Sequence, residues 1–352
     1  MAATAGVVAD PDRISPEWLS AALSAPVREV TVTPVGTGQI GSVFRLEITG
    51  ATGPQRLMAK LPAADPAART MLAGPYRQEV RFYTEIAPTV AVRVPACHYA
   101  EFTGDGAEFT LLLEDLAPAC QGDQLSGCTI GQARAAVRNL AGLHGPRWCD
   151  PALEAIEGLG INGPSEAGML AEFYGPATEI FLDRLGDSLA PQDHDTLRAC
   201  VPGIAEWLLA APQRFAPTHG DYRLDNLMFA PASDSGDAEV WAVDWQTVGL
   251  GLPARDLSYF IATSLEPEQR RAHEEELVET YWRALGEHGV TGYTLEQCRD
   301  DYGFALIQGP LVAVLGAAYG SPTPRGDRMF TTMVRRSCAA IREWDALSRR
   351  PG

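Results

Sequence analysis

The stretch HGDYRLDN at residues 219–226, followed by AVDWQ at residues 242–246, decides the fold. Asp221 and Asn226 lie five positions apart, and Asp244 ends a short apolar run that is typical of a strand. A carboxylate can take the proton of an attacking hydroxyl, and Mg²⁺ prefers carboxylate and amide oxygens as ligands. The pattern indicates phosphoryl transfer, with Asp221 as the base and Asn226 and Asp244 as metal ligands.

A glycine motif, GTGQIGSV at residues 36–43, precedes this stretch. Apolar and polar residues alternate from residue 42 to 49, which predicts a strand directly after the glycines. Gly36, Gly38 and Gly41 would then join two antiparallel strands and let backbone N–H groups approach phosphates. A dinucleotide-binding turn, as in an NAD(P)H-dependent oxidoreductase, would need a helix after Gly41. Besides a phosphate-binding loop and a dinucleotide-binding turn, the third interpretation of the motif is an ordinary hairpin with flexible glycines.

The position of the one lysine favours the nucleotide-loop interpretation. Of the 28 lysine and arginine residues, only Lys60 is a lysine, and it lies on the strand predicted from Arg56 to Leu61. Glu79 lies on the helix predicted from Pro75 to Pro88. In a kinase-type site, a lysine on this strand contacts the α and β phosphates and a glutamate on the next helix holds it. The compact ammonium charge cannot be replaced there by a planar guanidinium.

Periodicity predicts an α+β fold in two lobes. Period-two patterns predict an N-terminal lobe, residues 1–115, with a five-stranded antiparallel sheet and one helix, preceded by a polar leader with a short helix over residues 16–23. Residues 116–352 are predicted to form a mostly helical lobe that also holds the catalytic loop, the metal site and the acceptor pocket. Its predicted helices are Ile130–Leu143, Ser165–Leu185, Asp193–Leu209, Glu268–Glu287, Leu295–Leu315 and Arg328–Leu347.

Composition excludes several classes of function. The net charge of −17 over 352 residues disfavours nucleic-acid and anionic-membrane partners. Seven cysteines without a CxxC pair suggest neither a disulfide framework nor a zinc site, and they fit a reducing compartment. The most apolar tract, Leu311–Tyr319, is too short to span a bilayer. We therefore expect a cytoplasmic protein.

These motifs resemble those of the aminoglycoside phosphotransferase and choline kinase superfamily, from about Val35 to Tyr302. HGDYRLDN is similar to its catalytic loop, and Asp244 to its metal aspartate. DWQ at residues 244–246 and EVRFY at residues 79–83 are most similar to the ecdysteroid-kinase-like branch. The resemblance implies a protein-kinase-like bilobal fold, ATP and Mg²⁺ as cofactors, and a hydroxyl group of a small molecule as phosphate acceptor. It also implies that the EDL segment, from Glu114 to Leu116, binds adenine through backbone groups.

The resemblance has consequences for neighbouring residues. Asp256 would anchor the catalytic loop, and His219 would be a scaffold residue rather than a base. We interpret Arg223 as an exposed arginine paired with Asp225. The segment after Asp244 is too short for an activation loop or a peptide platform, which favours a small-molecule acceptor over a protein.

Two alternatives of function stay open at this point. The acidic surface permits a polycationic acceptor, as in an antibiotic-inactivating phosphotransferase. A catalytically silent nucleotide-binding protein is the other, although Lys60, Asp221, Asn226 and Asp244 argue against it. No motif identifies the acceptor alcohol, the choice of ATP over GTP, or the oligomeric state.

Overall fold

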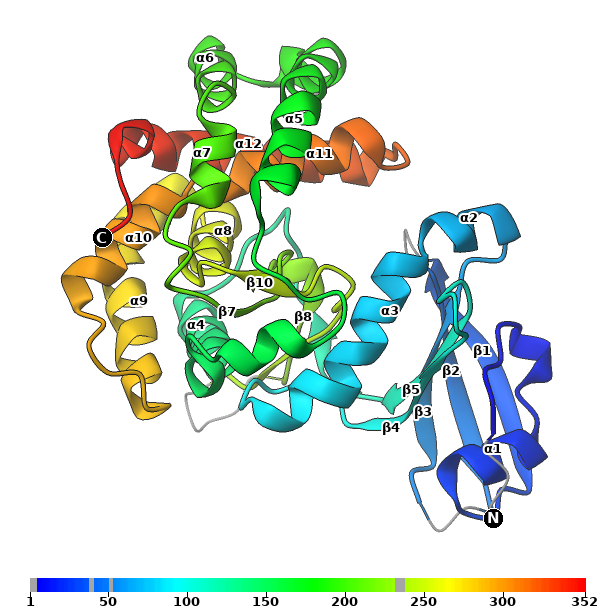
Figure 1. Ribbon diagram of the computed structural model, residues 1–352. Coiled ribbons are helices and arrows are strands. Elements are labelled where there is room, and N and C mark those ends of the chain that lie inside the picture. The colour runs from blue at the N-terminus through cyan, green and yellow to red at the C-terminus, as the bar shows by residue number, and fades with distance from the viewer. Residues whose placement is uncertain (1–4, 38–40, 51–52, 232–237) are drawn as a thin grey trace. The chain divides into compact units, whose positions relative to one another are not determined.

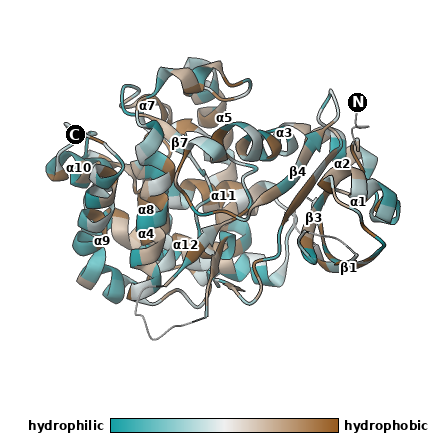
Figure 2. Ribbon diagram, turned by 90° about the horizontal axis from the view of Figure 1, so that it is seen from below, coloured by the Kyte–Doolittle hydropathy of each residue, from teal (hydrophilic) through white to brown (hydrophobic). Residues whose placement is uncertain are grey.

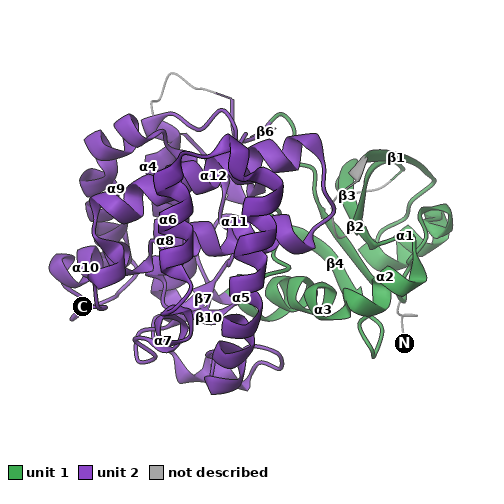
Figure 3. Cartoon of the chain, turned by 90° about the horizontal axis from the view of Figure 1, so that it is seen from above, with its two compact units in different colours: residues 1–88, 94–118, 243–247 green, residues 89–93, 119–242, 248–352 purple. Residues whose placement is uncertain are grey.

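The structure, a computed structural model, describes residues 5–37, 41–50, 53–231 and 238–352 (Figure 1). The chain forms two compact units (Figure 3). Unit 1 comprises residues 1–88, 94–118 and 243–247, and unit 2 comprises residues 89–93, 119–242 and 248–352. The units are interleaved in sequence, since the DWQ segment belongs to unit 1 although unit 2 flanks it on both sides.

Unit 1 is built on the predicted five-stranded antiparallel sheet, which is confirmed. The strands have the order β1-β2-β3-β5-β4. They are β1 (Glu29–Thr37), β2 (Gly41–Thr49), β3 (Arg56–Pro62), β4 (Cys97–Phe102) and β5 (Phe109–Glu114). Alternating apolar residues of β2 and β3, such as Leu46 and Leu57, are fully buried, as expected for strands with one face on a core.

The glycine motif joins two paired strands. β1 and β2 are antiparallel, and Gly36 lies opposite Val43. The strand β2 begins at Gly41, where a dinucleotide-binding fold would begin a helix, so the oxidoreductase interpretation is wrong. Gly38 lies outside the described residues.

Unit 1 also holds the helices α1 (Pro16–Leu23), α2 (Pro66–Met71) and α3 (Ala73–Arg81). After α3 the chain continues as a π-helical turn, η2 (Phe82–Ile86), and then as η3 (Ala87–Thr89). The prediction of a polar leader is wrong, because Val8, Ile14 and Leu19 are buried in the same core as the sheet residues. Ser15 caps α1 by accepting a hydrogen bond from the N–H of Trp18 at 3.2 Å. A 3₁₀ turn, η1 (Pro11–Arg13), precedes it.

Unit 2 is mostly helical. Its helices are α4 (Ile130–His144), α5 (Pro164–Leu185), α6 (Pro191–Cys200), α7 (Ile204–Leu209), α8 (Ala254–Ser264), α9 (Pro267–Glu287), α10 (Leu295–Ala305), α11 (Gln308–Tyr319) and α12 (Pro324–Glu343). The hydrophilic residues of the polar helix α9 are visible as teal segments in Figure 2. The 3₁₀ turns of this unit are η4 (Gly145–Arg147), η5 (Pro151–Ala155), η6 (Gly186–Ser188), η7 (Leu224–Asn226) and η8 (Ala346–Ser348).

Three helical predictions differ from the structure. The helix predicted over Asp193–Leu209 is two helices, because Pro202 and Gly203 interrupt it. The helix predicted over Leu295–Leu315 is divided into α10 and α11, and Pro310 lies in the first turn of α11, where proline is tolerated. The helix α8 has no counterpart among the predicted helices, and all of its residues are buried.

Residues Leu295–Tyr319, which include α10 and α11, are long and apolar enough to cross a membrane, alone among the described helices. This stretch is longer than the apolar tract noted in the sequence. Its most apolar window is 67% buried inside the protein, and α11 packs against α5, α8 and α12. A core helix has the same length and composition, so the stretch is weak support for a membrane span.

Short strands in unit 2 hold the HGDYRLDN loop. β7 (Ala216–Thr218) pairs with β10 (Gly249–Gly251), and β8 (Leu227–Phe229) pairs with both β6 (Cys120–Gln121) and β9 (Val240–Ala242). β8 and β9 are antiparallel neighbours. The loop 219–226 therefore begins where β7 ends and finishes where β8 begins.

Candidate functional site

The loop of residues 219–226 brings Asp221 and Asn226 together within unit 2. Gly220 has a φ of +79°, a left-handed conformation that favours glycine, and it turns the chain directly before Asp221. The 3₁₀ turn η7 then brings Asn226 back to the aspartate. The amide nitrogen Nδ2 of Asn226 donates to the backbone oxygen and to Oδ2 of Asp221, both at 2.9 Å.

The carboxylate of Asp221 has two further partners. The hydroxyl of Tyr259, on α8, donates to Oδ1 at 2.7 Å, and Nε of Arg223 donates to Oδ2 at 3.0 Å. The predicted pairing of Arg223 with Asp225 is present, but the prediction that this arginine is exposed is wrong. Its side chain is only 16% exposed, and Asp225 Oδ2 is farther from it, at 3.6 Å, than Asp221 is. The backbone N–H of Arg223 donates to the backbone oxygen of Asp221 at 2.9 Å, and this tight turn keeps the two residues close, which linear spacing could not reveal.

Asp256 fixes the backbone at the start of this loop by hydrogen bonds. This side chain is 1% exposed and accepts hydrogen bonds from the backbone N–H groups of His219 at 2.6 Å and Gly220 at 3.0 Å. Nε2 of the buried His144 lies 3.3 Å from Asp256 Oδ2, and its Nδ1 lies 2.7 Å from the hydroxyl of Tyr281. These contacts are those of an anchoring residue, and His219 is fully buried, as a scaffold residue would be.

Replacing Asp256 by alanine should destabilise the fold. The change removes the acceptor of two backbone N–H groups, one of them fully buried, so we expect a loss of about 2–4 kcal/mol in the free energy of unfolding. Chemical denaturation monitored by circular dichroism measures this loss. The control is Glu179→Ala, which removes an ion pair with Arg198 whose side chains are both about half exposed, and it should change the stability by less than about 1 kcal/mol. Equal effects of the two substitutions would contradict the anchoring role.

The C-terminal helix α12 also reaches this loop. Arg325 donates to both carboxylate oxygens of Asp225, at 2.8 and 2.9 Å, and to Asp123 Oδ1 at 3.0 Å. The backbone N–H of Gln124 donates to Asp225 Oδ1 at 3.0 Å. Burial alone would raise the pKa of Asp225, but the Arg325 and Gln124 hydrogen bonds and the charge of Arg223 hold it below its ordinary value. Arg325 could not be predicted as a partner of this loop, because it lies 100 residues from Asp225 and outside the motifs quoted above.

In unit 1, Lys60 lies between two carboxylates. Its Nζ is 2.8 Å from Oε1 and 2.7 Å from Oε2 of Glu79, and it donates to Oδ1 of Asp244 at 2.9 Å. Glu79 is 1% exposed and the Lys60 side chain 14%, whereas the Asp244 side chain is 42% exposed. The structure thus brings together the lysine, the helix glutamate and the DWQ aspartate.

Burial and the neighbouring charges have opposite effects on the pKa values of Lys60 and Glu79. Burial would lower the pKa of Lys60, but the carboxylates of Glu79 and Asp244 outweigh it and raise that pKa above its ordinary value. Burial raises the pKa of Glu79, and the charge of Lys60 opposes this effect. The lysine therefore carries a full positive charge at neutral pH.

The DWQ segment is fixed by ring stacking. The rings of Trp245 and Phe82 are parallel, 4° apart in orientation, with centroids separated by 3.5 Å. The backbone N–H of Trp245 also points to Glu79 Oε1, at 3.4 Å. Asp244 has a φ of +68°, a left-handed conformation that costs energy for residues other than glycine and is frequent at functional sites. Tryptophan here takes a packing role that binds the segment to the end of α3.

Gly41 and Glu114 belong to the predicted glycine loop and hinge, and their roles in nucleotide binding stay predictions. A Cβ atom on Gly41 would lie 2.7 Å from the backbone oxygen of Leu61, so only glycine fits where β2 passes β3. At the predicted hinge, the N–H of Glu114 donates to the backbone oxygen of Ala96 at 2.9 Å and cannot also bind adenine. The adenine contact of Leu116 stays a prediction.

Asn226 and Asp244 each offer an oxygen atom of the kind that Mg²⁺ binds. Asn226 uses its amide nitrogen on Asp221, which leaves its oxygen as a ligand atom. Asp244 offers a half-exposed carboxylate, and both groups are oxygen ligands of the kind Mg²⁺ takes. Asn226 belongs to unit 2 and Asp244 to unit 1. Across the described ranges, no group of three or more His, Cys, Asp and Glu side chains is arranged to hold a metal ion.

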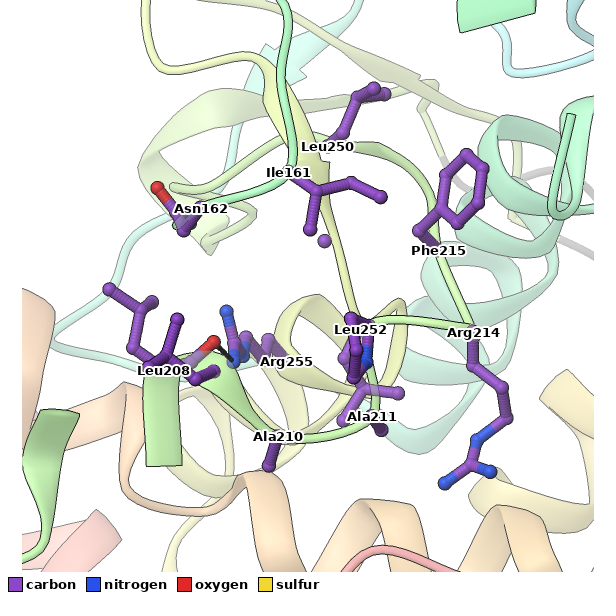
Figure 4. Close-up of a pocket in the computed structure, with 13 residues that line it drawn as sticks. Ile161, Asn162, Leu208, Ala210, Ala211, Arg214, Phe215, Leu250, Leu252 and Arg255 are labelled. Atoms are coloured by element: carbon purple, nitrogen blue, oxygen red, sulfur yellow. Dashed lines mark hydrogen bonds between the residues drawn. The ribbon is translucent and has the colours of Figure 1, made fainter. Parts of the chain in front are cut away.

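Unit 2 also encloses a small cavity (Figure 4), lined by residues that include Ile161, Asn162, Leu208, Phe215, Leu252 and Arg255. Arg255 donates to the carbonyl oxygens of Trp207 at 3.0 Å and Leu208 at 2.8 Å, at the end of α7. Burial lowers the pKa of Arg255 to about 10. The cavity volume is about 10 Å³, the space of one water molecule, which is too small for a nucleotide or an acceptor.

Comparison with known proteins confirms the predicted resemblance. The model of the ecdysteroid kinase-like family matches residues 198–290, a segment that contains the catalytic loop, Asp244 and Asp256. No curated protein sequence matches the chain.

Solved structures share the fold at low sequence identity. Choline kinase from Cryptosporidium parvum Iowa II has a TM-score of 0.57 and 9% identity, over 89% of each chain. A candidate aminoglycoside phosphotransferase from Ralstonia eutropha JMP134 has a TM-score of 0.51 and 18% identity, over 93% of this chain and 97% of that one. The GDP complex of wild-type aminoglycoside 2′-phosphotransferase-IIIa has a TM-score of 0.50 and 14% identity, over 88% and 92%. The chain therefore has the protein-kinase-like α+β fold of small-molecule phosphotransferases.

Proposed function

We propose that the protein is an ATP- and Mg²⁺-dependent phosphotransferase that transfers the γ-phosphoryl group to a hydroxyl of a small molecule. The observation that carries this proposal is the pairing of Lys60 with Glu79 and Asp244 in unit 1, together with the contact of Asp221 with Asn226 in unit 2. Each is an arrangement that phosphoryl transfer requires. The family match and the shared fold support it.

In this proposal each residue has one task. Asp221 orients the acceptor hydroxyl and takes its proton. Lys60, held by Glu79, places its charge on the α and β phosphates beneath the loop of Gly36, Gly38 and Gly41. Asn226 and Asp244 would hold Mg²⁺, which neutralises charge on the phosphates when bound.

Thermal unfolding with nucleotides tests the binding half of the proposal. ATP at a hundred times its dissociation constant should stabilise the protein by about 2.7 kcal/mol, which shifts the unfolding temperature by a few degrees. We expect this shift with ATP and Mg²⁺ together, and none with NADH. GTP in parallel tests the choice of nucleotide. The shift should be lost in Asp244→Asn, which keeps a residue that tolerates the left-handed backbone but removes the charge. A shift retained in this variant would contradict the metal role of Asp244.

The antibiotic-inactivating alternative rests on the net charge of −17. Next to the catalytic loop, however, Asp225 is paired with Arg325 and Arg223, and Asp123 with Arg325. A polycationic acceptor would meet carboxylates that are already neutralised. We therefore favour an alcohol without several positive charges, and aminoglycoside resistance conferred on a sensitive host would contradict this choice.

The proposed location is the cytoplasm. All seven cysteines are free, which fits a reducing compartment and the cytosolic supply of ATP.

A further inference from the structure

The buried helix α8 contacts the catalytic loop at two points. Asp256 and Tyr259 are three residues apart, so they lie on the same face of the helix. Asp256 binds the backbone N–H groups of His219 and Gly220, and the hydroxyl of Tyr259 donates to Oδ1 of Asp221 at 2.7 Å. One helix thus sets both the backbone position and the carboxylate orientation of the proposed base.

The two oxygens of the Asp221 carboxylate differ in their partners. Oδ2 accepts from Arg223 Nε at 3.0 Å and from Asn226 Nδ2 at 2.9 Å, and these bonds occupy both of its lone pairs. Oδ1 accepts only from Tyr259 within the part of the chain that the structure describes. One lone pair of Oδ1 is therefore left for an incoming hydroxyl.

We propose that Oδ1 is the oxygen that receives the acceptor's proton, and that Tyr259 is the positioning residue that holds it. The inference rests on the proposed function. In the step, the O–H bond of the acceptor breaks and its proton moves to Oδ1. The electron pair of the acceptor oxygen forms the bond to the γ-phosphorus, while the bond from that phosphorus to the bridging oxygen breaks and ADP leaves.

Tyr259 is suited to this task because its hydroxyl stays a donor. The side chain is fully buried, and burial, with the nearby charge of Asp221, raises its pKa well above the ordinary value. The tyrosine therefore stays protonated throughout the neutral pH range, and its O–H group donates a hydrogen bond to the carboxylate. No motif in the sequence marks Tyr259, and the burial of the whole helix does not show which of its side chains contacts the catalytic loop.

Tyr259→Phe tests the inference in an ATP hydrolysis assay. Mg²⁺·ATP is the probe, water takes the place of the acceptor hydroxyl, and the rate of ADP release is measured. We expect kcat to fall about tenfold, equivalent to about 1.4 kcal/mol, with the KM for ATP unchanged. The control is Tyr302→Phe, because the buried Tyr302 hydroxyl donates to the carboxylate of Glu274 at 3.1 Å and makes the same kind of bond elsewhere in unit 2. It should leave kcat unchanged, and thermal unfolding of both variants measures any shared loss of stability.

A double-mutant cycle distinguishes an effect of Tyr259 on the position of Asp221 from a general loss of structure. If Tyr259 acts through Asp221, its hydroxyl has no further effect on ADP release in the Asp221→Asn background. A tenfold loss that persists in that background, or equal losses in Tyr259→Phe and Tyr302→Phe, would overturn the inference and leave the proposed function standing. If Asp221→Asn releases ADP as fast as the wild type, the proposed function fails, and the inference fails with it.

Discussion

We expect Asp221→Asn to lower kcat by about 10²–10⁴-fold, the range that a general base contributes, while ATP binds as tightly as in the wild type. The fold should survive this substitution. The amide oxygen can keep the two donors that Oδ2 now accepts, from Arg223 and Asn226, and the amide nitrogen can donate to the hydroxyl oxygen of Tyr259. The variant therefore removes proton acceptance and little else.

Steady-state kinetics and a nucleotide titration check this expectation together. A fall in kcat with an unchanged dissociation constant for ATP assigns Asp221 to the chemical step. Glu179→Gln removes one exposed carboxylate elsewhere in unit 2 and serves as the charge control, with unchanged turnover. Unchanged turnover in Asp221→Asn would remove this residue from the mechanism.

Lys60→Met should have the second large effect, and it should act on stability as well as activity. The substitution leaves Glu79, which is 1% exposed, as a buried carboxylate without its cation. Breaking a buried ion pair on one side costs about 3–5 kcal/mol. Turnover should also fall by orders of magnitude, because the charge that steadies the phosphates is lost.

Two further variants separate these effects. In Lys60→Met combined with Glu79→Gln, the buried charge is gone, so denaturation should show that much of the lost stability returns while activity does not. Lys60→Arg keeps the charge but changes its shape, and it should be more stable than Lys60→Met and still poorly active. Activity restored in the double variant would contradict the role of Lys60 at the phosphates.

The sheet and the motif residues could be predicted because their signals are local. Period-two alternation marks β2 and β3, and the single lysine lies on β3, with Glu79 on α3. The spacing of Asp221 and Asn226 is likewise a property of one short loop. Such patterns depend on neighbours in sequence, so the amino-acid order alone carries them.

The contacts that support the base could not be predicted because they join distant segments. Tyr259 lies on a helix whose residues are all buried, and Arg325 lies 100 residues from its partner Asp225. The pairing of Arg223 with Asp225 is present, but the hydrogen bond of Arg223 to Asp221 could not be predicted from linear spacing. The spacing of apolar residues predicts a helix or a strand, but it does not predict which buried side chain contacts which carboxylate.

The central claim is the transfer of a phosphoryl group from ATP to an alcohol, and its most direct measurement follows that group. ATP labelled in the γ-phosphate is incubated with Mg²⁺, a panel of small alcohols, and either the wild type or Asp221→Asn, and the products are separated and identified by mass. We expect the wild type to place the label on an alcohol only when Mg²⁺ is present, and Asp221→Asn to place almost none. Label on no alcohol in the panel, or equal transfer by the variant, would contradict the assignment of this protein as an Asp221-dependent phosphotransferase.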